Sequence, residues 1–326
     1  MVLFSYMDIQ GIPIHSRVFL GPMAGVTNLA YRRFMKPFGV GLSFSEMISD
    51  CGLDYGNKMT FQYLKTDDVD RPVALQLFGS DIEKGVEAVK ILEANADYDI
   101  LDLNFGCPVP KVTKSGAGSA MLKDPDRLYA YAKAIVEASH KPVSAKIRLG
   151  WDENSINVEE TALKLQEAGI CLLTIHARTA KQLYSGKPDY ERIRGLGKRL
   201  SIPLCVSGDI FTPEDALKAM EIASADYVMV ARGGLGNPRL ITDINLALEG
   251  KPTNPKPTIQ EQAAWAKEIA ALLVEQDGEK VASMKLRGLL PHFFYGFPGY
   301  KKIRARISSP EFHYADLQAL LAGLGA

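Results

Sequence analysis

The stretch that decides the fold is residues 72–105, PVALQLFGSDIEKGVEAVKILEANADYDILDLNF. It begins and ends with short apolar runs, PVALQLFG at 72–79 and ILDLNF at 100–105, which are typical of buried strands. Between them Ser80 is placed to cap a helix. The apolar residues of that helix fall on one face and are Ile82, Val86, Val89 and Leu92. A strand, a helix and a second strand in this order predict parallel strands joined by a crossover helix.

The same alternation runs along most of the chain. Amphipathic segments that begin with Pro and acidic residues lie at 124–139 and 212–224. The eight strand-like runs lie at 18–23, 42–47, 72–79, 100–105, 142–149, 172–177, 203–208 and 227–232. Eight strands each followed by a helix predict an α/β fold, a closed (β/α)8 TIM barrel, in preference to an open doubly wound sheet.

The barrel pattern stops before a segment rich in Pro and Gly, LEGKPTNPKPT at 248–258, which has the composition of a linker. Thr258 and Glu261 then form the signature of a capping box at the start of a helix. Ser309, Pro310 and Glu311 indicate the start of a last helix that continues through the C-terminal tail. We therefore expect a barrel domain at 1–248, a linker at 249–258 and a small all-helical domain at 259–326.

Composition excludes several classes of protein. Charged residues make up 23% of the chain and hydrophobic residues 47%, and no apolar run is long enough to span a bilayer. The N-terminus lacks the basic and apolar regions of a signal peptide, so we expect a cytoplasmic protein without a membrane partner. Lys+Arg and Asp+Glu both total 38, so any nucleic-acid surface must be local.

The four cysteines contain no C-x-x-C pair, which argues against a zinc site and against a disulfide framework. Cys171 and Cys205 lie in strand-like runs and are expected to be small buried hydrophobic residues. Cys107 differs because Gly106 and Pro108 flank it, and these residues do not suit a helix interior or a central strand. We expect Cys107 on an exposed loop, where a rigidly held thiol can act as a general acid.

In a barrel of this type the active site lies at the C-terminal ends of the strands and in the loops that follow. These positions hold Met23, Glu46, Gln76, Asn104, Cys107, Lys146, Arg148, His176, residues 207–209 and residues 231–234. The turns SGD at 207–209 and ARGGLGNP at 231–238 follow strands seven and eight, where barrels often bind phosphate through backbone N–H groups. They predict a phosphorylated cofactor, although a glycine-rich turn can also close a barrel for purely steric reasons.

Three polar residues in these strands have two interpretations each. Lys146 either forms an ion pair with a carboxylate such as Asp102 or stabilises negative charge on a cofactor ring. Gln76 either hydrogen-bonds the same ring edge or is a satisfied polar group inside the barrel. His176 either donates to a phosphate or ring carbonyl or is a structural histidine.

Taken together, these motifs resemble those of the tRNA-dihydrouridine synthase family, in its bacterial B-type form. The resemblance covers the whole chain. The motifs that carry it are PMAGVT at 22–27, SEM at 45–47, QLFGS at 76–80, NFGCP at 104–108, KSGAGSAML at 114–122, KIRLGW at 146–151, TIHARTA at 174–180, SGD at 207–209 and GFPG at 296–299.

The resemblance implies an FMN-containing barrel that reduces the C5–C6 bond of particular uridines in tRNA and uses NADPH to reduce the flavin. Cys107 is implied as the proton donor, Asn104 as a contact to the uracil edge and Arg148 as a contact to the base or phosphate. The residues implied for FMN are Pro22, Met23 and Ala24 against the ring, Gln76 and Lys146 at its pyrimidine edge, and His176, Ser207, Gly208, Asp209, Ala231 and Arg232 at its ribityl phosphate. Many members of the family have Asn where this chain has Ser207 and Gly where it has Ala231, which puts the detail of phosphate binding in doubt.

A uridine in folded tRNA must be swung out to reach a barrel mouth. The basic run 109–122, which includes Lys114, is expected to act as a mobile lid that meets the tRNA. Basic residues of the helical domain, interleaved with Tyr295, Phe297 and Tyr300, favour an RNA-facing patch over an ordinary solvated face. They are Lys285, Arg287, Lys301, Lys302, Arg304 and Arg306. We expect tRNA as partner, no metal and a monomer.

Two other functions fit parts of the pattern. An FMN barrel that acts on a small pyrimidine, such as a dihydroorotate or dihydropyrimidine dehydrogenase, also has an Asn-x-x-Cys-Pro turn near its flavin. Such an enzyme has no need of the basic C-terminal surface. An RNA-binding protein without turnover is disfavoured by the presence of Cys107, Lys146 and His176 together.

Overall fold

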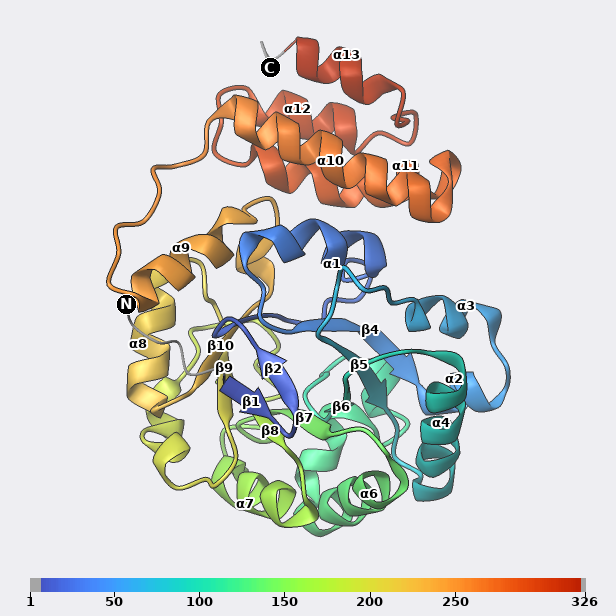
Figure 1. The fold of residues 1–326 in the computed structure, drawn as a ribbon, viewed down its shortest axis with the longest axis vertical. Helices are drawn as coiled ribbons and strands as arrows, with labels where there is room; N and C mark the ends of the chain where they lie inside the picture. The colour runs from blue at the N-terminus through green and yellow to red at the C-terminus, as the bar shows by residue number, and fades with distance from the viewer. Residues whose placement is uncertain (1–6, 324–326) are drawn as a thin grey trace.

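The computed structural model describes residues 7–323, and its centre is a closed barrel of eight parallel strands (Figure 1). The strands are β3 (Val18–Leu20), β4 (Ser43–Ser49), β5 (Val73–Phe78), β6 (Ile100–Asn104), β7 (Val143–Arg148), β8 (Leu172–His176), β9 (Leu204–Ser207) and β10 (Tyr227–Val230). Each strand pairs with the next in sequence, and β10 pairs with β3 through Val228 and Val18, which closes the ring. The predicted barrel is confirmed, and each strand lies within an expected run except β4, which extends two residues beyond the run 42–47.

Helices surround the barrel on the outside (Figure 1). They are α1 (Leu29–Met35), α2 (Asp50–Asp54), α3 (Lys58–Phe61), α4 (Ile82–Asn95), α5 (Pro110–Thr113), α6 (Pro125–Ala138), α7 (Val158–Ala168), α8 (Pro213–Ala223) and α9 (Arg239–Leu248). The prediction that Ser80 caps α4 is wrong. The Asp81 carboxylate accepts the Lys84 N–H at the start of α4, while the Ser80 hydroxyl donates to the Ser115 carbonyl 2.8 Å away.

The sixth strand departs from the predicted alternation. β8 is followed by 3-10 helices at Tyr190–Ile193 and Leu196–Lys198, where an α-helix was expected. The intervening sequence contains Gly186, Pro188 and Gly195, which interrupt an α-helix. A long loop, residues 177–189, therefore lies over the C-terminal end of the barrel.

A short N-terminal hairpin, β1 (Met7–Ile9) and β2 (Ile12–Ile14), lies at the opposite end of the barrel. Its turn uses positive φ angles at Gln10 and Gly11, as a two-residue hairpin loop requires. Ile9 and Ile14 are buried in one apolar cluster with residues such as Leu172 and Tyr227, which begin their strands. The hairpin therefore covers the N-terminal ends of the strands. It was not predicted, because strands of three residues are too short to show a periodicity.

The C-terminal part is helical, as predicted. It contains α10 (Ile259–Asp277), α11 (Glu279–Leu289), a 3-10 turn (Leu290–Phe294), α12 (Tyr300–Ile307) and α13 (Asp316–Ala322). Residues 251–258 form no helix or strand, and the capping box of Thr258 and Glu261 is present. The last helix begins at Asp316 and not at Ser309, because 308–311 form a turn. Residues 324–326 of the predicted helix, and residues 1–6, lie outside the described range.

The C-terminal helices pack on one side of the barrel, over α1 (Figure 1). The side-chain oxygen of Gln276 in α10 accepts the Ala30 N–H at 2.7 Å, next to the start of α1. The rings of Phe34 and Phe293 lie 6.0 Å apart across the same interface. These contacts fix the helices beside the mouth of the barrel. Between residues 7 and 323, no helix is long and apolar enough to cross a membrane.

Candidate functional site

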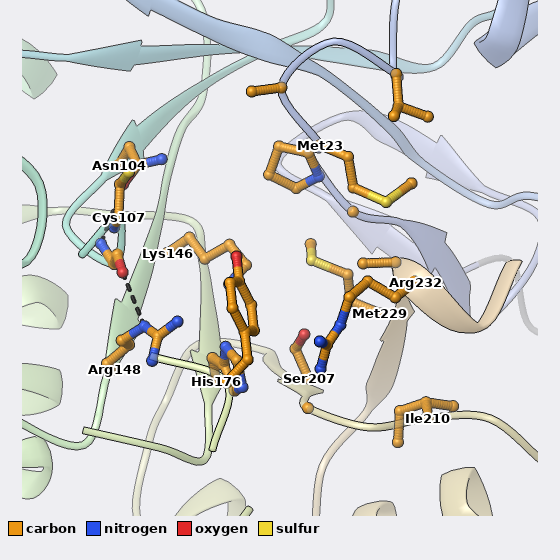
Figure 2. A pocket seen from close by; sticks show the side chains of 18 of the residues that line it. Met23, Asn104, Cys107, Lys146, Arg148, His176, Ser207, Ile210, Met229 and Arg232 are labelled. Atoms are coloured by element: carbon orange, nitrogen blue, oxygen red, sulfur yellow. Dashed lines mark hydrogen bonds between the residues drawn. The ribbon is translucent and has the colours of Figure 1, made fainter. Parts of the chain in front are cut away.

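A cavity of about 390 Å³ lies at the C-terminal ends of the barrel strands, where the sequence predicts the active site (Figure 2). Its walls include every residue predicted to touch the cofactor, together with Cys107 and two predicted contacts to the base. These wall residues are Pro22, Met23, Ala24, Gln76, Asn104, Cys107, Lys146, Arg148, His176, Ser207, Gly208, Asp209, Ala231 and Arg232. The fold therefore brings the set together, and the role of each member remains a prediction.

Polar side chains at the base of the cavity hold one another in place. Gln76 Nε2 and Ser144 Oγ each donate to the Asp102 carboxylate at 2.6 Å, and Gln76 Oε1 accepts from Asn104 Nδ2 at 2.6 Å. Burial raises the pKa of Asp102 to about 6, against the lowering effect of its two donors. Gln76 is thus a satisfied polar group, as one interpretation has it, and it also lines the cavity.

Lys146 faces the cavity without a carboxylate partner. In the described part of the chain it forms no ion pair within 4.0 Å. Asp102 is engaged by Gln76 and Ser144, so of the two interpretations of Lys146 the ion pair with Asp102 is wrong. Burial, reinforced by the charge of Arg148, lowers the pKa of Lys146 to about 8. Two neighbouring cations in a partly desolvated cavity attract an anion or an electron-rich oxygen.

Cys107 lies on the loop after β6, and its backbone is held from both sides. Asn104 Oδ1 accepts the N–H groups of Gly106 and Cys107 at 3.1 and 2.8 Å, and the Cys107 carbonyl accepts the Ser119 N–H at 3.0 Å. The residue is 9% exposed, so the prediction of an exposed thiol is wrong. It is a buried residue of the cavity wall, which suits a group that must meet a bound ligand and avoid bulk solvent.

Burial raises the pKa of the Cys107 thiol above its ordinary value of 9.0, and the nearby cations Arg148 and Lys146 only partly oppose this. A thiol whose pKa is raised above its ordinary value is protonated at neutral pH, so we expect no appreciable Cys107 thiolate at pH 7. The measurement is the ultraviolet absorbance of thiolate, taken as the difference between the protein and the Cys107→Ala variant across the pH range. A thiolate signal from this residue at pH 7 would contradict the structure and would indicate a nucleophile rather than an acid.

Arg148 joins two loops at the mouth of the cavity. Its Nε donates to the Gly106 carbonyl at 2.9 Å, and its Nη1 donates to the carbonyls of Thr179 and Leu183, both at 2.8 Å. It thereby ties the Cys107 loop to the long loop after β8, and Figure 2 shows the bond to the Cys107 loop as a dashed line. Since Nη2 has no such partner among the described residues, a ligand can still be bound by this nitrogen.

Tyr184 is a cavity residue that the sequence analysis missed. It is 56% exposed, and its ring centre lies 5.6 Å from the Arg148 guanidinium and 4.4 Å from that of Arg232. An aromatic ring beside two guanidinium groups provides a flat, electron-rich wall. The available signal was its place in a long loop after a barrel strand, where binding residues concentrate.

The loops after β9 and β10 form the other wall. Gly208 has a φ of +126°, and a Cβ there would come within 3.0 Å of the His176 ring. Asp209, which is not glycine, has a φ of +47°, a strained conformation that tends to occur at functional sites. Within residues 7–323, the N–H groups of Gly208, Asp209, Arg232 and Gly233 donate to no protein acceptor. All four residues line the cavity, and unengaged backbone N–H groups in a cavity wall can bind an anion.

Arg178 organises this wall and was also missed, although it lies within the TIHARTA motif. It is fully buried and binds the Asp209 carboxylate, which also receives Arg232 Nη2 at 2.7 Å. These arginines lower the pKa of Asp209, and they leave its backbone N–H as the group that meets a ligand. His176 Nε2 lies 3.3 Å from Arg178 Nη1, so it accepts and the ring proton lies on Nδ1. Burial and the surrounding cations lower the pKa of His176 well below its usual value, so the ring is neutral.

A second hollow, which we call the groove, runs from the cavity toward the helical part. Its volume is about 900 Å³. It shares Phe211, Arg232, Gly233 and Leu235 with the cavity. Its cationic or titratable residues include Arg232, Lys256, Arg287, His292 and Arg304, and its aromatic residues include Tyr295, Phe297 and Tyr300. The predicted interleaving of aromatic and basic residues is therefore found here for Arg287 and Arg304.

The other residues predicted to contact tRNA lie outside the groove. Lys301, Lys302 and Arg306 are exposed on α12, and Lys114 is exposed at the end of α5. Lys285 forms an ion pair of 2.7 Å with Asp277, at the junction of α10 and α11, so its charge is already paired. The predicted lid is folded as α5 and a 3-10 helix (Gly118–Lys123), with Val112 and Ala117 packed beside Cys107. The described residues contain no cluster of His, Cys, Asp or Glu suited to a metal ion.

Comparison with known families identifies the chain. The model of the family described as Dihydrouridine synthase (Dus) matches residues 19–322. The chain belongs to the dihydrouridine synthase family. The match covers both the barrel and the C-terminal helices, so both parts are features of this enzyme family, and the resemblance seen in the sequence is confirmed.

Relatives within the dihydrouridine synthase family are similar over most of their length. The probable tRNA-dihydrouridine synthase 1 of Synechocystis sp. is 34% identical over 302 residues, which cover 92% of this chain and 84% of the relative. The tRNA-dihydrouridine synthase B of Pasteurella multocida is 34% identical over 258 residues, which cover 78% of this chain and 77% of the relative.

Solved structures show similarity of fold at low sequence identity. The histamine dehydrogenase from Rhizobium sp. 4-9 is 13% identical, with a TM-score of 0.58 over 83% of this chain and 51% of that chain. A 2-naphthoyl-CoA reductase is 14% identical, with a TM-score of 0.56 over 76% of this chain and 52% of that chain. The chain thus spans about half the length of these proteins, and the similarity concerns the fold alone.

Proposed function

We propose that this enzyme reduces particular uridines of tRNA to 5,6-dihydrouridine, with FMN bound in the barrel and NADPH as the reductant. The observation that carries the proposal is the content of one cavity. Within residues 7–323, a buried protonated thiol, an ammonium without an ion-pair partner and residues whose backbone N–H groups have no protein acceptor all line the same space. These are the groups that a flavin phosphate, a flavin ring and a proton transfer to carbon require.

The residues present fit FMN. The free N–H groups at 208–209 and 232–233 suit the dianionic phosphate, and the nearby Arg232 guanidinium adds positive charge. Lys146 and the remaining amide hydrogen of Gln76 suit the oxygen and nitrogen atoms at the pyrimidine edge of the ring. Met23 and Met229 offer apolar contact to its faces. FMN bound there would supply the hydride that the reaction needs.

Cys107 supplies the proton. Reduction of the C5–C6 bond adds a hydride to C6 and a proton to C5, and the proton leaves Sγ of Cys107 as the new C–H bond forms. The resulting thiolate is then reprotonated from solvent through the cavity mouth. The raised pKa keeps the thiol protonated at neutral pH before each turnover, which is the state that a general acid must have.

The mouth of the cavity suits an unstacked base. Val109, Tyr184 and Phe211 line it and are 49%, 56% and 48% exposed, an unusual gathering of exposed apolar side chains. A flipped uracil gains stacking and apolar contact from such groups. Asn104 then contacts its edge, and the free Nη2 of Arg148 contacts the base or its phosphate.

The groove supports a macromolecular substrate. It continues from the cavity past Arg232 and Phe211, and Arg287 and Arg304 line it together with the exposed Tyr295 and the half-buried Phe297. Phosphates that flank a flipped nucleotide can be neutralised there, and unstacked bases can rest on Tyr295 or Phe297. We therefore propose that residues 259–323 form a tRNA-binding domain and that 249–258 is its linker. A small pyrimidine leaves this groove without a role.

The proposal is tested with the purified enzyme, unmodified tRNA transcript and NADPH. We expect flavin to copurify, and dihydrouridine to appear as a mass increase of tRNA fragments that matches two added hydrogens. Free uracil and orotate are the comparison substrates. Turnover of either in place of tRNA would favour the small-pyrimidine enzyme, and tRNA binding without bound flavin or turnover would favour an RNA-binding protein.

A further inference from the structure

A chain of hydrogen bonds connects the interior of the barrel to the Cys107 loop. It begins at Asp102, passes through the amides of Gln76 and Asn104, and ends at the N–H groups of Gly106 and Cys107. Asp102 and Gln76 are fully buried, and Asn104 is 6% exposed. β5 and β6 bring the first members together, because Gln76 and Asp102 are partners in the strand register.

The direction of this chain is fixed at both ends. The Asp102 carboxylate accepts from Ser144 and Gln76, so Gln76 must turn its NH2 group toward Asp102 and its carbonyl toward Asn104. Asn104 must then turn its NH2 group to Gln76 and its carbonyl to the loop. The backbone N–H groups of the loop can only donate, so they demand the same orientation independently. Neither amide can flip without leaving buried groups unpaired.

We propose that Asp102 is a positioning residue that sets the orientation of Gln76 and Asn104. Two consequences follow for the cavity. The Asn104 carbonyl, occupied by two N–H groups, holds the loop that carries Cys107. Each of the two amide NH2 groups has one hydrogen that the chain of hydrogen bonds does not use. The part of the cavity wall beside Lys146 therefore presents N–H donors, which recognise carbonyl oxygens of a pyrimidine or flavin ring. The second consequence rests on the proposed function, and the first does not.

The direction of the chain can be tested by reversing it. Asn104→Asp places a carboxylate, which can only accept, on each side of Gln76. Because Gln76 has one NH2 group and one carbonyl, its carbonyl must then face one of the two carboxylates. We expect the melting temperature to fall by on the order of 5 °C. Adding Asp102→Asn lets the new amide at 102 donate to the Gln76 carbonyl, while Gln76 donates to position 104 and Ser144 donates to the amide oxygen. Every member is then paired in the reverse direction, and most of the lost melting temperature should return.

The matched control separates direction from charge. Asp102→Leu combined with Asn104→Asp also removes one of two neighbouring carboxylates, but it offers no donor to Gln76. Recovery with Asp102→Asn and not with Asp102→Leu supports the proposal. Equal recovery with both would show that repulsion between the carboxylates explains the loss, and no loss in Asn104→Asp alone would show that the chain has no fixed direction. Either result overturns the proposal. Neither substrate nor flavin enters this measurement, so it stands if the proposed function fails.

The functional consequence is measured on the Asp102→Asn, Asn104→Asp double variant in the holoenzyme. Its stability should be restored, but its cavity edge carries a carboxylate where the wild type presents an N–H. We expect kcat for tRNA to stay at least about tenfold below wild type, while the Kd for tRNA stays within about twofold of it. The reason is that replacing an N–H donor by an acceptor affects the contact with the reacting base and not the surface that binds the rest of the tRNA. The visible band of bound flavin should shift. Full kcat in this double variant would overturn the role of the donors.

Discussion

Replacing Cys107 by alanine is expected to lower kcat for dihydrouridine formation by about 10²–10⁴-fold, the usual contribution of a positioned general acid. The loss should be specific to the proton transfer. In the proposed function other parts of the cavity wall bind the flavin phosphate and ring, so the variant should retain bound flavin, and NADPH should still bleach its visible absorbance. The measurement is single-turnover reduction of tRNA by prereduced enzyme.

Cys51→Ala is the matched control for this prediction. Cys51 is a half-buried thiol, more exposed than Cys107, but it lies at α2 beside Lys84 and does not line the cavity. We expect wild-type turnover from it. Turnover near the wild-type rate in Cys107→Ala would mean that another group delivers the proton, and loss of flavin from that variant would mean that the substitution disturbs the wall rather than the acid.

The barrel could be predicted because each strand is buried on both faces and therefore appears as a short continuous apolar run. The active-site residues could be predicted because the barrel places the ends of all such runs at one edge. That rule alone selected Lys146, Arg148 and Cys107, and the structure places all three on the cavity wall. Their burial was harder to foresee. A glycine and a proline indicate a loop, but only the packing of neighbouring loops decides that the Cys107 thiol faces inward.

What the sequence could not supply depends on contacts between distant segments. Lys285 is a basic residue of the kind that contacts RNA, yet the turn between α10 and α11 brings Asp277 to within 2.7 Å of it. The two interpretations of Lys146 could not be separated from the sequence, because the choice depends on the register of β5, β6 and β7, which places Gln76 and Ser144 beside Asp102. Tyr184 lies in a loop without periodicity, so only its position after a barrel strand could have indicated it. Lys256 and His292 of the groove come together only when the linker and the helical part fold against the barrel.

Reversing two charges in the groove should weaken tRNA binding and leave the chemistry intact. Arg287 and Arg304 line the groove from α11 and α12, outside the cavity. If each contributes one charge-assisted contact to phosphate, Arg287→Glu with Arg304→Glu should raise the Kd for tRNA by on the order of 100-fold. The slope of log Kd against the logarithm of the salt concentration should decrease by about 2, because roughly one unit of slope is lost with each phosphate contact. Bound flavin and its reduction by NADPH should be unchanged, because neither arginine reaches the cavity.

The control must carry the same change in net charge. Lys267 and Lys280 are exposed on α10 and α11 and line neither the groove nor the cavity, so Lys267→Glu with Lys280→Glu alters the long-range field equally. If the two double variants weaken binding to the same extent, the groove has no specific role, and general attraction between the domain and tRNA explains the effect. If only the groove variant is impaired, phosphates dock where the groove meets the cavity. The uridine to be reduced is then the nucleotide that the groove leaves beside Arg232 and Tyr184.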